Sequence, residues 1–293
     1  MIDTPLKTWV IASRPKTLPA AMAPVLIGTA IAYESGGFHL LSCLAAVIGA
    51  LLIQVGTNFA NDYYDYKKGA DEGERLGPTR VTQSRMVTPS TMKKATYYMF
   101  SLALVSGVYL VLRGGWPIVI IGLSSILFGV LYTGGPYPLG YNGLADIFVL
   151  IFFGPVAVGG TYYVQTLDIN YIILLAGLSP GFFSVAILTV NNLRDIDNDK
   201  RVGKKTLAVR FGASYARMQY SVAVIIGILI PLLIVLFISD KYVSLISLLT
   251  LIVAVPLIKK VYTVIGRELN NVLASTGQLL LLYSILFSIG WLL

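Results

Sequence analysis

Residues 58–71 read NFANDYYDYKKGAD and follow directly on a long apolar run, so they stand where an apolar segment reaches a polar boundary. Their spacing of three, four and seven residues places four polar side chains on one face of a helix, namely Asn58, Asn61, Asp62 and Asp65. Gly69 breaks this helix, and Asp71 reaches back from the loop that follows. Three carboxylates at the edge of an apolar segment repel one another and desolvate badly unless cations neutralise them. The stretch therefore predicts a cation site at a helix end.

A second stretch of the same kind, NNLRDIDNDKRVGKKTLAVRFG, occupies residues 191–212 and also closes an apolar run. Asn191, Asp195 and Asp199 recur every four residues along one helical stripe, whereas Asp197 points away from it and is left out of the site. Carboxylates at a membrane interface are costly and mark function by default. Oxygen ligands without His or Cys suit hard cations, above all Mg²⁺ bridging to phosphate. The two helix ends therefore predict one shared site for a metal ion and a diphosphate.

The composition is that of a membrane protein. Apolar residues make up 56% of the 293 residues and charged residues only 12%, whereas a soluble domain carries about 25% charged residues. The single cysteine, Cys43, excludes an intrachain disulfide and a cysteine metal cluster, and the single histidine, His39, lies in a short loop between apolar segments. Chemistry that needs a histidine base or a histidine metal site therefore has little to draw on.

Nine apolar runs are candidates to cross a bilayer, which takes about 20 residues or somewhat fewer with polar ends. They cover residues 18–34, 40–62, 93–112, 116–133, 144–164, 171–193, 215–238, 242–258 and 272–292. With the N-terminus in the cytoplasm, only Arg113 and Lys241 of the 22 Lys and Arg residues lie on the outer side, as the positive-inside rule requires. The membrane thus accounts for the net charge of +8, and we expect no nucleic-acid partner. Both acidic stretches then lie at the cytoplasmic side.

The chain is expected to form one domain over residues 1–293, an all-α integral membrane protein with nine transmembrane helices. The second and sixth predicted spans run in the same direction and end in the two acidic stretches. This layout indicates a weak parallel repeat of about 1–140 and 141–293, with the site between the halves. We expect a multi-pass protein of the cell (inner) membrane whose N-terminus and active site are cytoplasmic.

Basic and aromatic residues near the two stretches are candidates for contact with an anionic substrate. Arg80 in GPTRVTQS suits bidentate phosphate contact, and Lys205 in GKKT suits a point-charge contact. Lys68 follows the first stretch, while Arg14 and Lys16 are either anion ligands or interface anchors. Several tyrosines cluster near the motif ends, Tyr137 and Tyr141 among them, and an aromatic face attracts a carbocation by about 0.5–2 kcal/mol. Asp146, at the start of the fifth predicted span, is either a site residue or a helix-start acid.

At these residues the chain resembles the UbiA superfamily of intramembrane prenyltransferases. The first family motif, NDxxD, is Asn61-Asp62-Tyr63-Tyr64-Asp65, and the second, DxxxD, runs from Asp195 to Asp199. The family's G-x-K-[ST] follows as GKKT at residues 203–206. The further Asp of the first motif departs from the commonest spacing, since Gly69 stands four residues after Asp65 and Asp71 comes two later. RPKTLPAA, NDYYDYKKGAD and GPTRVTQS are most similar to the MenA branch, which prenylates 1,4-dihydroxy-2-naphthoate.

The resemblance implies a UbiA-like bundle that transfers a polyprenyl group from polyprenyl diphosphate to 1,4-dihydroxy-2-naphthoate, with loss of CO₂ and diphosphate, giving demethylmenaquinone. It implies that Mg²⁺ is held by Asp62, Asp65, Asp71, Asp195 and Asp199. Asn58, Asn61 and Asn191 would support the substrate, and Arg80 and Lys205 would neutralise the leaving group. Alternatives are a prenyltransferase for another aromatic acceptor, such as 4-hydroxybenzoate or homogentisate, or a divalent-cation transporter. A transporter would need acidic residues deep on both sides of the bilayer, and the outer half has few.

Overall fold

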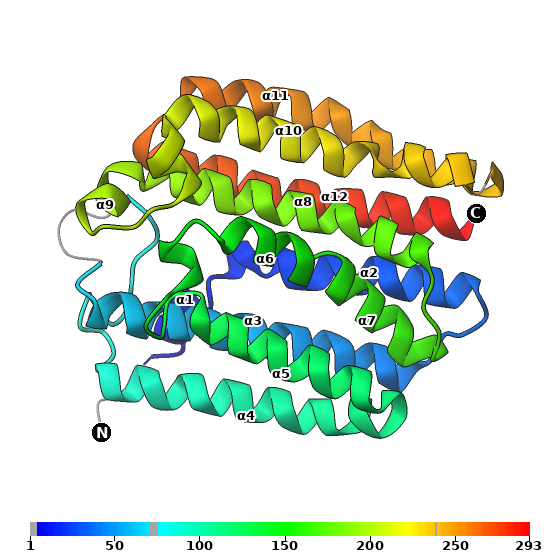
Figure 1. Cartoon of the computed structure of the whole chain (residues 1–293), viewed down its shortest axis with the longest axis horizontal. Helices are drawn as coiled ribbons and strands as arrows, with labels where there is room; N and C mark the ends of the chain where they lie inside the picture. Colours follow the sequence, from blue (N-terminus) through cyan, green and yellow to red (C-terminus); the bar gives the residue numbers. More distant parts are fainter. Residues whose placement is uncertain (1–4, 71–75, 238) are drawn as a thin grey trace.

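Helices lie lengthwise beside one another in a computed structural model of the chain, which describes residues 5–70, 76–237 and 239–293 (Figure 1). No strand occurs among these described residues. The α-helices are α1 (Leu6–Ser13), α2 (Pro19–Glu34), α3 (Leu40–Lys67), α4 (Pro89–Gly114), α5 (Trp116–Leu131), α6 (Ala145–Phe152), α7 (Pro155–Thr166), α8 (Tyr171–Arg194), α9 (Ile196–Arg201), α10 (Leu207–Phe237), α11 (Leu251–Thr263) and α12 (Leu269–Leu292). Short 3-10 helices are η1 (Pro15–Thr17), η2 (Leu139–Tyr141), η3 (Ser239–Thr250) and η4 (Gly266–Glu268). The all-α prediction is confirmed.

The described helices are those of a multi-pass membrane protein. Seven helical segments are long and apolar enough to cross a bilayer, and an eighth arises if the pair Leu6–Thr17 and Pro19–Glu34, bent by 56°, is one span. Helix α5 is apolar but has only 16 residues, which is about 24 Å of helix against a hydrocarbon core of about 30 Å. All nine predicted runs coincide with helical segments, but the count of nine crossings stays a prediction.

Local sequence signals explain where several helices begin and end. Thr88 and Asn170 accept hydrogen bonds from the backbone N–H groups of the first turns of α4 and α8, which is the usual N-cap. Gly115 has φ of 66°, a backbone conformation that favours glycine, and it separates α4 from α5. These two helices therefore form a tight antiparallel hairpin.

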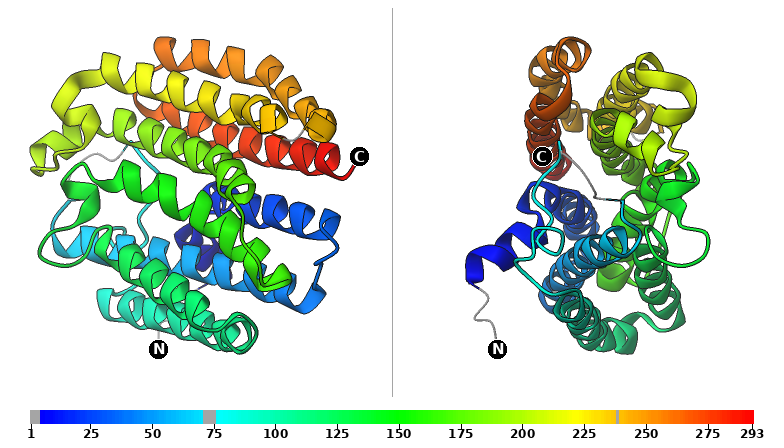
Figure 2. Two further views of the ribbon diagram at one scale, coloured as in Figure 1. Left: turned by 45° about the vertical axis from the view of Figure 1, so that its right-hand side comes forward. Right: turned by 90° about the vertical axis from the view of Figure 1, so that its left-hand side faces the viewer.

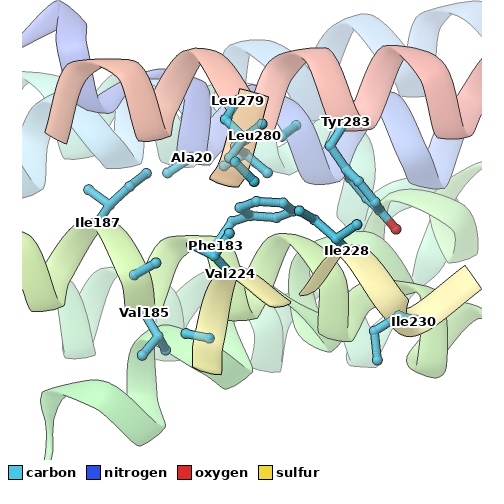
Figure 3. Packing of buried hydrophobic residues seen from close by; sticks show 14 of the residues in the cluster. Ala20, Phe183, Val185, Ile187, Val224, Ile228, Ile230, Leu279, Leu280 and Tyr283 are labelled. Atoms are coloured by element: carbon cyan, nitrogen blue, oxygen red, sulfur yellow. The ribbon is translucent and has the colours of Figure 1, made fainter. Parts of the chain in front are cut away.

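Helix α8 is the centre of the bundle. It packs against α10 and α12 on one side and against α2, α6 and α7 on the other. Figure 3 shows Phe183 of α8 beside Ile228 of α10 and Tyr283 of α12, in the larger cluster of buried apolar residues. Gly177 and Gly181 of α8 let the break between α6 and α7 approach closely, since a Cβ on either would lie within 2.7 Å of that backbone. Such close helix contacts supply packing energy in a bilayer, where apolar side chains gain little by leaving lipid.

The ends of α3 and α8 that carry the two acidic stretches lie at the same end of the bundle (Figure 1). A second, smaller apolar cluster holds the α3–α4 loop against α1, α3 and α4 there; it comprises Ala12, Phe59, Val81, Val87 and Met92. Two further views show that this end also carries α9 and the loops on either side of it (Figure 2). The fold therefore brings together two segments far apart in sequence.

Candidate active site

The four polar residues of α3 lie on one helix and are buried, as the spacing predicts. Asp62 and Asp65 are each 2% exposed. The Asn58 side-chain amide donates to the Ser13 carbonyl oxygen at 2.9 Å, which fixes the end of α1 to α3. The Asn61 side-chain oxygen accepts from the Thr133 hydroxyl at 2.8 Å. In this structure the two asparagines therefore position the chain around the carboxylates.

The α3–α4 loop closes over Asp62. The Asp62 carboxylate accepts hydrogen bonds from the backbone N–H groups of Val81 and Thr82, both at 3.1 Å. Such bonds to backbone donors replace the hydration that a buried carboxylate loses. Arg80, the residue before them, is thereby placed beside α3.

The Asp65 carboxylate interacts with three side chains. It forms a buried ion pair with Arg80 at 2.6 Å, accepts the Tyr141 hydroxyl hydrogen bond at 3.0 Å, and lies 3.8 Å from the Lys204 ammonium. A buried carboxylate needs such compensation, because desolvation of an isolated charge costs several kcal/mol. Arg80 therefore lies beside Asp65, and its contact with a phosphate stays a prediction.

The second stretch lies on two helices rather than one. Helix α8 ends at Arg194, Asp195 stands at the break, and α9 begins at Ile196. The backbone N–H groups of Asp195 and Asp199 still bond to the carbonyl oxygens four residues earlier, so the break is confined to one residue. Asp199 on α9 is 4% exposed, and Asp197 is exposed, in agreement with its exclusion from the site. At the break, the Arg194 guanidinium donates to the carboxylate of its neighbour Asp195, with Nε at 2.9 Å.

Arg194 also fastens three elements to one another. Its guanidinium donates to the side-chain oxygens of Asn191 and of Asn270, which belongs to α12. Asn270 in turn donates to the Leu76 carbonyl oxygen of the α3–α4 loop at 2.8 Å. A Cβ at Gly77 would lie 2.7 Å from the guanidinium, so a larger residue there would displace the Arg194 side chain or the loop that covers it. Asn191 thus supports Arg194 in this structure.

Lys204 joins the two stretches. Its ammonium lies 3.4 Å from the Asp199 carboxylate and 3.8 Å from that of Asp65. The Asn198 side-chain amide adds a bond to the Ala70 carbonyl oxygen at 3.1 Å. Burial raises the pKa of Asp199 to about 6, and the nearby Lys204 ammonium opposes that rise. The two acidic stretches therefore form one site, as their separate patterns suggested.

The ammonium groups of two lysines lie over the ring of Tyr141. Lys68 lies 4.6 Å and Lys204 4.7 Å from the ring centroid, in the range of cation–π attraction. Lys68 also donates to the Thr133 carbonyl oxygen at 2.6 Å. Burial lowers the pKa of Lys68, the Asp65 carboxylate opposes this, and the Lys204 ammonium lowers it further. Burial and Asp65 raise the pKa of Tyr141, which keeps its hydroxyl a hydrogen-bond donor.

Several predicted residues do not contact this cluster. The Lys205 side chain is exposed, and its backbone N–H donates to the Tyr141 carbonyl oxygen, so Lys204 rather than Lys205 faces the carboxylates. Lys16 is exposed, and Tyr137 is 64% exposed. Asp146 is buried and accepts from Gln219 at 2.6 Å. Asp71 lies outside the described residues.

Arg14 reaches the site from the end of α1. Its guanidinium is close enough to Asp62, Asp65 and Arg194 for their charges to interact. One terminal nitrogen, Nη2, is buried and has no hydrogen-bond partner among the described residues. A buried, unpaired donor on a cation is costly unless an anionic ligand satisfies it. Arg14 is therefore well placed to meet an anion, whereas Lys16 is not.

The carboxylates suit a hard cation that is shared with a substrate. Within the described part of the chain, no three Asp, Glu, His or Cys side chains gather closely enough to hold a metal by themselves. The predicted set of five ligands includes Asp71, which lies outside that part, and stays a prediction. Mg²⁺ is usually held by one or two carboxylates together with substrate phosphates and water. Asp65 and Asp199, which share the Lys204 ammonium, provide such a pair.

An apolar cavity of about 490 Å³ begins beside the site and extends between α2, α3, α4, α5, α6 and α7. Thr57, next to Asn58, and Tyr132 line its near end, and Tyr132 is close enough to Asp65 and Asp199 to interact with their charges. Along α5 the lining runs from Tyr132 to Ile118, which is about 21 Å of helix. The volume is that of a small-molecule site, and the lining suits a long hydrocarbon.

Comparison with known proteins gives a consistent result. The family model described as the UbiA prenyltransferase family matches residues 21–291. A 1,4-dihydroxy-2-naphthoate octaprenyltransferase of Haemophilus influenzae is 36% identical over 99% of this chain and 97% of its own. One of the same description from Escherichia coli is 38% identical over 97% of this chain and 94% of its own.

A solved structure shares the fold. The structure of a UbiA homolog from Archaeoglobus fulgidus bound to GPP and Mg²⁺ matches with a TM-score of 0.71 and 13% sequence identity, covering 97% of this chain and 99% of that one.

Proposed function

Since this chain belongs to the UbiA prenyltransferase family, we propose that it transfers a polyprenyl group from polyprenyl diphosphate to 1,4-dihydroxy-2-naphthoate in menaquinone biosynthesis. The observation that carries the proposal is the junction of the two acidic stretches at Lys204, directly beside a long apolar cavity. A charged site for the diphosphate thus adjoins an apolar space for the hydrocarbon, and the relatives described as octaprenyltransferases cover nearly the whole chain.

Asp65 and Asp199 would hold the divalent ion, with Asp62 and Asp195 completing its surroundings. When bound, Mg²⁺ neutralises the diphosphate and stabilises the charge that develops on it. Asp62 keeps the α3–α4 loop closed through the backbone of Val81 and Thr82. The choice of Mg²⁺ is supported by the donor set, which is oxygen-only, and by the ion bound in the A. fulgidus homolog.

The cations of the site would stabilise the leaving group. Lys204, Lys68 and Arg80 surround Asp65, and Arg14 offers a donor without a partner in the described chain. As the allylic C–O bond breaks, the electron pair goes to the diphosphate oxygen, and fixed cations there lower the barrier. Lys204 takes the role first assigned to Lys205, because its ammonium is the one that faces the carboxylates.

The ring carbon of the naphthoate that bears the carboxylate would then attack the allylic carbon of the donor. A C–C bond forms, and loss of CO₂ returns the bonding electrons to the ring, giving demethylmenaquinol, the reduced form of demethylmenaquinone. Tyr132 lines the end of the cavity next to the charged site, where an aromatic face stabilises a developing allylic cation. No histidine is needed for this sequence of steps.

The orientation of the protein in the membrane follows from the distribution of its basic residues. The loops at the end that carries α9 hold most of the Lys and Arg residues, so we expect this end and the N-terminus to face the cytoplasm of a cell with an inner membrane.

The test is turnover in membranes that contain the protein, supplied with octaprenyl diphosphate, Mg²⁺ and 1,4-dihydroxy-2-naphthoate. Product should vanish with EDTA and in Asp199→Asn, while Asp197→Asn, on the same short helix but exposed, should remain active. Product only with another phenolic acid, such as 4-hydroxybenzoate, would overturn the acceptor and keep the reaction class. A folded protein without product from any acceptor would overturn prenyl transfer and make cation transport the next hypothesis.

A further inference from the structure

The lining of the apolar cavity includes a few polar side chains. They are Gln54, Thr57, Ser106, Ser125, Tyr132 and Thr161. Thr57 precedes Asn58 directly, Gln54 is one helical turn before it on α3, and Tyr132 follows the end of α5. A hydrocarbon chain gains nothing from polar atoms at this end of the cavity. Gln54, Thr57 and Tyr132 therefore need another explanation, either in the protein or in a ligand.

One face of α3 leads from the cavity into the charged site. Ala50, Gln54 and Thr57 line the cavity at intervals of four and three residues, and Asn61 and Asp65 continue the same face at intervals of four. With a rise of about 1.5 Å per residue, Thr57 lies about 12 Å and Gln54 about 17 Å before Asp65 along the helix. A diphosphate bound at Asp65 and its allylic carbon occupy the first part of this length. The acceptor ring has to meet that carbon, so it comes next.

The protein does not satisfy the polar atoms of these three residues. Gln54 is 9% exposed, and its side-chain nitrogen makes one long bond of 3.5 Å to the Thr17 hydroxyl. Within the described residues, the Gln54 side-chain oxygen and the hydroxyls of Thr57 and Tyr132 have no hydrogen bond. A buried amide oxygen without a donor costs free energy. Because Gln54 lines the cavity, a ligand with a hydroxyl group could supply that donor.

An aromatic wall borders the same end of the cavity. It consists of Phe128, Phe148 and Phe152, whose rings all line the cavity. The centroid of Phe128 lies 4.6 Å from that of Phe148 and 5.2 Å from that of Phe152. Phe128 is one turn before Tyr132 on α5, and its neighbour Gly129 packs on Thr57, since a Cβ there would lie 2.5 Å from the Thr57 hydroxyl oxygen. Aromatic walls with a few polar groups suit a flat ring that carries hydroxyls.

We propose that this end of the cavity binds the ring of 1,4-dihydroxy-2-naphthoate, with Gln54 as the residue that selects for the 4-hydroxyl group. The inference rests on the proposed function, because it takes this acceptor as the ligand. The ring carbon that bears the carboxylate faces the allylic carbon, so the adjacent 1-hydroxyl lies toward the charged site, near Thr57 and Tyr132. The 4-hydroxyl, on the opposite side of the ring, points deeper and donates to the Gln54 side-chain oxygen.

The experiment compares the Kd of 1,4-dihydroxy-2-naphthoate with that of 1-hydroxy-2-naphthoate, which lacks the 4-hydroxyl, for proteins in nanodiscs without oxygen. The wild type should bind the dihydroxy compound about tenfold more tightly, which is the effect of about one hydrogen bond. Gln54→Leu should lose this preference. Ser106→Ala is the matched control and should keep it, because Ser106 lines the same cavity but its hydroxyl already donates to the Ala103 carbonyl oxygen at 3.1 Å.

Two further variants keep the test independent of the folding of Gln54→Leu. Gln54→Met retains the length of the side chain without its amide, so it should also lose the preference. Thr57→Val removes the hydroxyl that faces the shared 1-hydroxyl, so it should weaken the binding of both compounds alike. Thermal unfolding of each variant checks that the protein is folded.

An unchanged preference in folded Gln54→Leu or Gln54→Met would overturn the inference, and so would an equal loss of preference in Ser106→Ala. Tighter binding of octaprenyl diphosphate to Gln54→Leu, with unchanged naphthoate binding, would show that the prenyl chain rather than the ring lies against Gln54. Turnover separates this inference from the proposed function. A wild type that binds dihydroxynaphthoate through Gln54 but forms no prenylated product would overturn the proposed function alone.

Discussion

Replacing Lys204 by alanine, with Lys205→Ala as its control, isolates the residue that joins the two halves of the site. The two lysines are adjacent, and both fit the GKKT pattern. Lys204 lies 3.4 Å from Asp199 and 3.8 Å from Asp65, with its side chain 16% exposed, whereas Lys205 is exposed. Only the loss of Lys204 leaves Asp199 without its ion pair and removes a positive charge from the space between the two stretches.

The expected magnitude follows from the role of a fixed charge at the leaving group. Loss of one preorganised group that stabilises developing charge costs about 10²–10³ in kcat, or about 2.7–4 kcal/mol. Two other cations offset part of this loss, because the Lys68 ammonium also lies over the Tyr141 ring and Arg80 still pairs with Asp65. We therefore expect Lys204→Ala to lower kcat with octaprenyl diphosphate about 10²-fold, with Lys205→Ala close to wild type.

The assay is steady-state prenylation at saturating Mg²⁺ in nanodiscs, with thermal unfolding of each variant as the check on folding. Equal losses in Lys204→Ala and Lys205→Ala, or a larger loss in Lys205→Ala, would refute the assignment of Lys204 as the inward-facing lysine. A loss in Lys204→Ala that Lys204→Arg does not reduce would show that charge at this position is not what matters.

Three further predictions concern the same site. Asp199 is uncharged below its raised pKa of about 6 and binds metal only when charged. The apparent Mg²⁺ affinity should therefore rise as the pH increases through about 6. In Asp199→Asn the Mg²⁺ affinity should show no such rise. In Arg194→Lys the single ammonium group cannot bond to Asp195 and Asn270 together. This variant should bind Mg²⁺ about tenfold more weakly, with little change in KM for naphthoate. An unchanged Mg²⁺ titration would contradict a positioning role for Arg194. Arg14→Gln should raise the Kd for inorganic diphosphate in a binding titration about tenfold, and a wild-type Kd would show that Arg14 meets no anion.

The helical part of the site could be predicted from the sequence. Asp62 and Asp65 are placed by the regular spacing of a helix, which depends only on local geometry, and both are buried where that spacing puts them. Asp199 was found in the same way, although the helix breaks before it. The break at Asp195 could not be foreseen from spacing, because the sequence keeps a regular interval of four residues through it. The contact of Arg194 with Asn270 of the last helix is equally invisible to a local pattern.

The loop residues were harder to predict, for a physical reason. In GKKT the two lysines are chemically identical, and the backbone decides which one faces inward: Gly203 has φ of 75°, and the Lys205 backbone N–H bonds to Tyr141. Similarly, Tyr137 and Tyr141 belong to one loop, and the short 3-10 helix that ends at Tyr141 turns the second ring toward Asp65. Such orientations follow from contacts made by residues more than 60 positions apart, which no local pattern encodes.

Two hydrogen bonds of Tyr141 explain why the site depends on both halves of the chain. Tyr141 joins them by its hydroxyl bond to Asp65 and by its carbonyl bond from Lys205, so its ring is fixed under the ammonium groups of Lys68 and Lys204. Neither ammonium could stay beside the other unless the ring and Asp65 offset their repulsion. A diphosphate that binds here would meet two cations already held in place, so little of its binding energy would be lost in ordering them.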